Sequence, residues 1–113
     1  MEINNNDFIW YYKFLNDDYY GRPISGISEL KRNKVKDIKY ESIYHNATKT
    51  IYELDNGESI NDITWMVYDN EDIAIQHYNN SINQQIRVCN EHINKLELIK
   101  KELENKIIKE KLL

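Results

Sequence analysis

The chain is poor in the residues that carry covalent or cofactor chemistry, with one cysteine, one proline and three glycines in 113 residues. Because Cys89 is the only cysteine, no intrachain disulfide can form, and the fold must be held together by packing. The scattered glycines match neither a dinucleotide-binding loop nor a P-loop, since both motifs need glycines at fixed short spacings. The sequence therefore excludes a disulfide scaffold and the common phosphate-binding loops.

Metal-binding and nucleophile motifs are absent as well. No histidine is followed at i+3 or i+4 by a second His or Cys, the spacing that a metal site on a helix needs. Cys89 and His92 are three residues apart, but Cys89 falls among the apolar positions of a helix, where cysteine acts as a small buried apolar side chain. We therefore expect no enzymatic activity, no catalytic residue, no metal and no cofactor.

Long apolar runs are also missing, and none approaches the roughly 18 residues of a membrane span. The start of the chain, Met1–Asp7, is polar and has no basic leader-like segment. The net charge of −4 and the pI of about 5.4 argue against a protein that holds nucleic acid by counterion release. We expect a protein of the bacterial cytoplasm with no membrane partner. Its bias towards Asn, Ile and Lys indicates an AT-rich genome.

Aromatic residues are plentiful, with nine Tyr and two Trp, so the chain has the means to bury a small core. The pattern predicts an α+β fold with a single domain, 1–113. A β-rich part, 1–68, forms a small antiparallel sheet of three to five strands. One long amphipathic helix, 69–113, follows it.

Three segments of the β-rich part are typical of strands because they are rich in aromatic and β-branched residues. They are Asp7–Leu15, Val35–His45 and Thr50–Leu54. The last two are separated by a turn at Asn46–Thr48, which predicts an antiparallel hairpin.

Several details of the β-rich part follow from the same patterns. Polar Ser28–Lys34 predicts a loop, and Ile38, Tyr40 and Tyr44 form the more apolar face of the second strand. Asp55-Asn56-Gly57 predicts a tight turn. The segment Ser59–Tyr68 fits either a strand or an irregular packed segment.

The helix is predicted to begin after Asp69-Asn70, because a capping residue is followed by acids in the first turn. A second capping signal starts at Ser81, so a break near 79–81 is an alternative. Because the apolar face continues through this point without a change of phase, we favour one continuous helix.

Apolar residues on this helix recur with alternating steps of four and three, the spacing of the a and d positions of a coiled coil. We call this stripe the seam, and it comprises Ile82, Ile86, Cys89, Ile93, Leu96, Lys100, Leu103 and Ile107. Lys100 interrupts it at an a position, which costs stability but favours low-order assembly. We expect the seam to join two copies of the chain as a homodimer, with higher order left open.

A ligand site is one interpretation of Tyr19, Tyr20 and Arg22. Gly21 and Pro23 shape the backbone around Arg22, so aromatic rings and a guanidinium could clamp a small anion such as a nucleotide. The alternative is an edge strand with ordinary sheet tyrosines.

Charge is segregated along the chain, and seven acids lie between Thr50 and Gln76 with no Lys or Arg. This acidic stretch is either a solvated face or a docking surface for a basic host protein. Under the second interpretation the contact residues are Glu53, Asp55, Glu58, Asp62 and Trp65.

Taken together, these features predict a small non-enzymatic binding protein. Small size, AT-rich composition and segregated charge are similar, in a general way, to phage or mobile-element proteins that inhibit a host defence system by protein–protein binding. One alternative is an oligomeric protein that sequesters a nucleotide signal. Another is a structural protein that uses its helix for assembly.

Overall fold

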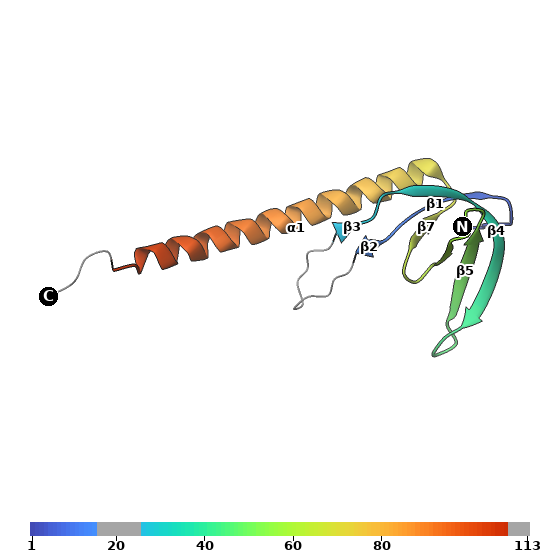
Figure 1. Ribbon diagram of the computed structural model, residues 1–113, viewed down its shortest axis with the longest axis horizontal. Coiled ribbons are helices and arrows are strands. Elements are labelled where there is room, and N and C mark those ends of the chain that lie inside the picture. The colour runs from blue at the N-terminus through green and yellow to red at the C-terminus, as the bar shows by residue number, and fades with distance from the viewer. Residues whose placement is uncertain (16–25, 109–113) are drawn as a thin grey trace.

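The computed structural model describes residues 1–15 and 26–108 and has an elongated shape of 79 × 33 × 24 Å. A β-sheet part lies at the N-terminal end of one long helix, which extends away from it (Figure 1). The described residues form the strands β1 (Phe8–Tyr12), β2 (Phe14–Leu15), β3 (Gly26–Ile27), β4 (Lys31–Ser42), β5 (Thr48–Leu54), β6 (Ser59–Asn61) and β7 (Met66–Tyr68), followed by the helix α1 (Glu71–Asn105).

The main sheet has five antiparallel strands in the order β6-β5-β4-β1-β7, and β2 pairs with β3 in a separate two-stranded sheet. The predicted α+β class is therefore confirmed, and so is the predicted hairpin, because β4 and β5 are its two arms. Lys13 interrupts the first predicted strand and divides it into β1 and β2.

The core lies on one face of this sheet. Its buried side chains come from four strands and are Ile9, Tyr11, Val35, Tyr52, Leu54 and Ile60. The Tyr11 hydroxyl accepts a hydrogen bond from Asn33 Nδ2 at 2.6 Å, so this buried phenol keeps a polar partner. Trp65 packs against the same cluster and meets the Tyr11 ring edge-on, with ring centroids 5.4 Å apart.

Strand β4 differs from its prediction at its N-terminal end. The expected loop Ser28–Lys34 is wrong from Lys31 onward, because Lys31–Lys34 already pair with β1. A charged side chain can be accommodated in this strand when its apolar stem or its cation packs on an aromatic ring. Arg32 does so, since its Cζ atom lies 3.8 Å from the centroid of the Phe8 ring.

The apolar face predicted for β4 was also partly wrong. A register shift between Val35 and Asp37 makes Lys36 an extra residue, so Val35 and Ile38 both reach the core although their spacing is odd. Tyr40 and Tyr44 do not reach it, since the hairpin extends past the core. Ile38 alone of the predicted face packs on the core cluster.

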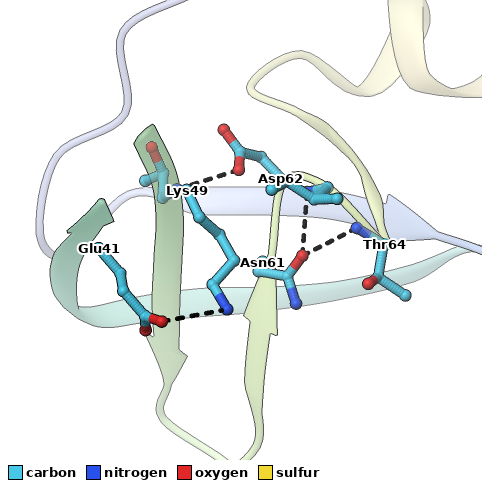
Figure 2. Close-up of polar contacts among 7 residues, drawn as sticks. Glu41, Lys49, Asn61, Asp62 and Thr64 are labelled. Atoms are coloured by element: carbon cyan, nitrogen blue, oxygen red, sulfur yellow. Dashed lines mark hydrogen bonds and ion pairs between the residues drawn. The ribbon is translucent and has the colours of Figure 1, made fainter. Parts of the chain in front are cut away.

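The turn of the β4–β5 hairpin lies a little earlier than predicted: β4 ends at Ser42 rather than His45, and Thr48 already belongs to β5. His45 and Asn46 have φ of 61° and 62° at the tip of the β4–β5 hairpin, and Gly57 has φ of 87° in the predicted turn after β5. In the ambiguous segment, the Asn61 side chain accepts hydrogen bonds from the backbone N–H groups of Ile63 and Thr64 and ends β6 (Figure 2). That segment therefore contains two short strands joined by a turn.

Helix α1 begins as predicted, with Asn70 as N-cap accepting a hydrogen bond from the Ile73 N–H at 3.1 Å. It runs without a break through 79–81. Ser81 does not cap a second helix, because its hydroxyl is hydrogen-bonded to the Tyr12 hydroxyl at 2.9 Å. The helix ends at Asn105, earlier than the predicted 113; residues 109–113 lie outside the described residues.

The first part of α1 is attached to the sheet by aromatic side chains. The Tyr12 ring lies between Tyr68, stacked at 6.1 Å, and Tyr78, edge-on at 5.1 Å. Tyr68 also stacks on His77 at 5.2 Å, and Ala74 is fully buried. This contact fixes the direction in which the rest of the helix leaves the β-sheet part.

Three buried or half-buried tyrosines should make the free energy of unfolding depend on pH in the alkaline range. Burial raises the pKa of Tyr11, Tyr52 and Tyr68 above the ordinary value of 10.0, and at Tyr68 the neighbouring Tyr12 hydroxyl adds to the effect. Above about pH 10 the unfolded chain therefore releases protons that the folded chain retains. We expect the free energy of unfolding to fall as pH rises from about 10 towards the folded-state pKa values.

Urea unfolding between about pH 8 and about pH 11 measures this fall. Tyr68→Phe removes one of the three groups and should make the fall shallower, whereas Tyr44→Phe, at an exposed position, should leave it unchanged. A stability that does not change across this range would contradict the expectation.

Candidate interaction surfaces

From Ile93 onward the seam lies along a part of α1 that the sheet does not cover. The side chains that face the β-sheet part are Ala74, Tyr78 and Ser81. At 100° per residue, Ile82 lies about a fifth of a turn from this side of the helix, whereas Leu96 and Leu103 lie in line with it but farther along the helix axis. Ile82 and Cys89 are half-buried, whereas Ile86 between them is exposed. Beyond them the seam is open to solvent.

Apolar side chains of the seam from Ile86 onward are unusually exposed, apart from Cys89. Ile86 is 52% exposed, Ile93 49%, Leu96 52% and Leu103 58%. Every residue from Ile93 to Asn105 is exposed, and Lys100 forms an ion pair with Glu104 on the same helix, with Nζ and Oε1 3.8 Å apart. The last predicted seam residue, Ile107, lies beyond the end of α1.

The predicted acidic surface is interleaved with basic residues by the β4–β5 hairpin. Glu53 on β5 forms an ion pair with Lys39 on β4 at 2.8 Å, and this carboxylate raises the pKa of Lys39. Glu41 and Lys49 form a second pair across the hairpin at 3.8 Å (Figure 2). The field of this surface is therefore weaker than the sequence alone indicated.

The other predicted contact residues of this surface have mixed surroundings. Asp55 and Glu58 are exposed, and the Asp62 carboxylate accepts a hydrogen bond from the Thr50 N–H at 3.0 Å (Figure 2). Trp65 is half-buried against the core, and Lys13 Nζ lies 4.7 Å from its ring centroid. Trp65 thus contributes to packing, and the acids around it are not gathered into one site.

The tip of the β4–β5 hairpin is an apolar surface that sequence reasoning missed. Tyr40 is 71% exposed and Tyr44 89% exposed, and Ile43 beside them is also exposed. The two tyrosines were predicted to face the core. They are exposed because the chain turns at His45-Asn46, where both residues have left-handed backbone conformations. Tyr44 therefore lies immediately before the tip of the hairpin.

The predicted nucleotide-binding residues Tyr19, Tyr20 and Arg22 lie outside the described residues. Within 1–15 and 26–108, no group of three or more His, Cys, Asp or Glu side chains is placed to hold a metal ion. Among the described residues, no helix has the length and apolar character needed to cross a membrane.

Comparison with known proteins gives no family to which the chain can be assigned. No family model, no curated protein and no solved structure matches it. The surfaces of the described residues that bear on function are therefore the exposed seam and the hairpin tip.

Proposed function

We infer that the chain is a non-enzymatic binding protein that acts as a pair of copies joined along the seam of α1. The observation that carries this inference is the exposure of four apolar seam side chains on a helix that projects from the β-sheet part: Ile86, Ile93, Leu96 and Leu103. Soluble monomers rarely leave large apolar patches uncovered.

Helix energetics support the same conclusion. Most of the stability of a protein helix comes from packing of its apolar face, because helix propensity alone leaves short isolated helices marginal in water. From Ile93 to Asn105 all side chains are exposed, so this part of α1 gains no such packing within one copy. The a and d spacing of its apolar residues is the spacing that fits a second helix.

Hydrogen exchange at different protein concentrations tests this function. In the pair, backbone amides of 93–105 should be protected, and dilution should reduce their protection because the separated helix frays. Amides of β1 and β5 serve as the internal control and should not respond to dilution. Weak protection of 93–105 at every concentration would reject the proposal.

The hairpin tip favours a second candidate function, that of an inhibitor that acts by protein–protein binding. Tyrosines are frequent at the energetic centres of protein interfaces, and Tyr40 and Tyr44 are both largely exposed, as is Ile43. A pair of copies would present two such tips, which raises avidity for a partner with two sites.

Replacing Tyr40 and Tyr44 together by serine tests the role of the tip. Because both side chains are exposed, we expect each substitution to change the free energy of unfolding by no more than about 0.5 kcal/mol. Capture of a host protein by the wild-type chain should be lost in this variant and retained in Ile63→Ser, whose apolar side chain is exposed elsewhere. Equal capture by both variants would exclude the tip as the binding surface.

A further inference from the structure

We propose that the two copies pair antiparallel, in a register centred between Asn94 and Lys95. This proposal rests on the proposed function, since it specifies how the second copy covers the seam. The parallel and antiparallel pairs, and their different registers, differ in which residues of the two seams face one another.

A parallel pair in register is unfavourable at Lys100. In that arrangement each a position faces the same residue of the partner copy, so two Lys100 ammonium groups would approach one another inside the apolar seam. The ion pair of Lys100 with Glu104 is exposed and gives little compensation.

Reversing the partner places a positions opposite d positions and removes this repulsion. With the centre between Asn94 and Lys95, each seam residue within α1 from Ile86 onward has a seam residue opposite it. The facing pairs are Ile86 with Leu103, Cys89 with Lys100, and Ile93 with Leu96. Each pair occurs twice because the two-fold axis exchanges the copies.

This register also suits Lys100 itself. Cys89 is a small side chain, so the aliphatic stem of Lys100 can lie over it while the ammonium remains at the surface beside Glu104. No other register within the helix both matches all apolar seam positions from Ile86 to Leu103 and keeps the two lysines apart.

Charges flanking the seam are compatible with the antiparallel register. Glu97 and Glu104 occupy e positions, and in an antiparallel pair e positions face e positions. Here Glu97 faces Asn90 of the partner copy, and Glu104 faces Asn83, so no carboxylate opposes another. At the g positions His92 faces Ile99, which extends the apolar contact.

The shape of the molecule agrees with this arrangement. The β-sheet part lies at the N-terminal end of α1, and the distal helix extends away from it (Figure 1). An antiparallel overlap from 83 to 105 would be about 34 Å long. The two β-sheet parts would then lie at opposite ends, and their hairpin tips would be far apart.

Disulfide trapping tests the orientation with the natural cysteine as the first probe. In a parallel pair the two Cys89 residues are neighbours, whereas in the antiparallel register they are 11 residues apart, about 16 Å along the helix axis. A disulfide needs Cα atoms within roughly 4.4–6.8 Å of one another. With diamide as the oxidant, we expect the wild-type pair to form little covalent dimer.

Lys100→Cys provides the positive arm, because the introduced thiol would face Cys89 of the partner copy. This variant should form at least about tenfold more covalent dimer than the wild type, and peptide mapping should find position 100 linked to Cys89. The matched control Cys89→Ser/Lys100→Cys should return to the wild-type level. Efficient linkage of wild-type Cys89, or of the control variant, would instead establish the parallel pair and overturn the proposal.

Failure of the pairing itself would give a different result. The noncovalent mass of each variant is measured before oxidation. A monomer mass for the wild type together with no linkage in any variant would reject the proposed function, and the orientation with it. A dimer mass with the parallel linkage pattern would reject the orientation alone.

Discussion

Replacing Leu96 and Leu103 together by alanine should convert the protein to a monomer at micromolar concentration. Both side chains are more than half exposed in one copy and would become buried in the pair. Truncation of a buried leucine to alanine costs about 2–5 kcal/mol. Two substitutions should therefore raise the dissociation constant of the pair by at least about a thousandfold, as measured by sedimentation equilibrium.

Leu98 provides the matched control for this experiment. It lies on the same helix between the two replaced residues, is 66% exposed and falls outside the seam. Leu98→Ala removes the same atoms from the same kind of surface, so it should leave the dissociation constant within a few-fold of wild type. If Leu98→Ala weakens association as much as the seam variant does, the contact is not made through the seam.

The second large effect is expected in the core of the β-sheet part. Ile9 is fully buried on β1, the strand between β4 and β7, and packs with side chains of four strands. Ile9→Ala should lower the free energy of unfolding by about 2–5 kcal/mol because it leaves a cavity that the sheet cannot close. Urea unfolding followed by circular dichroism measures the loss.

An isoleucine outside the core is the comparison for Ile9. Ile63 lies in the turn between β6 and β7 and is exposed, so Ile63→Ala should change the free energy of unfolding by no more than about 0.5 kcal/mol. Equal losses for both variants would contradict the assignment of the core to the Ile9 face of the sheet.

The parts of the fold that were predicted correctly are those that depend on local sequence. Asn70 followed by two acids satisfies the free N–H groups of a helix start, and the structure uses it in that way. Gly57 supplies the left-handed conformation of a tight turn, and the β4–β5 hairpin follows from two strand-like segments beside a turn. Each signal is complete within a few residues.

The parts that were missed depend on partners that are distant in the sequence. The extra residue Lys36 shows no local signal, yet it determines that both Val35 and Ile38 face the core. The early start of β4 depends on pairing of Lys31–Lys34 with β1, about 20 residues earlier in the chain. At Ser81 a local capping signal is overridden by a hydrogen bond to Tyr12, which is 69 residues away.

Of the candidate sites, only the geometry of the seam could be anticipated. Its a and d spacing is a property of one helix, and α1 contains the predicted positions from Ile82 to Leu103, whereas Ile107 lies beyond its end. The hairpin tip could not be located, because exposure of Tyr40 and Tyr44 depends on where the core ends. The acidic stretch has a weaker electrostatic field than its sequence indicates, because pairing of β4 with β5 brings Lys39 into an ion pair with Glu53.

The most direct test of the paired seam is the mass of the unmodified chain in solution. Sedimentation equilibrium across a dilution series should give twice the chain mass of 13.6 kDa at micromolar concentration, with a fall towards 13.6 kDa on dilution. A mass of 13.6 kDa at every concentration would contradict the account, because the seam of α1 would then remain uncovered in solution.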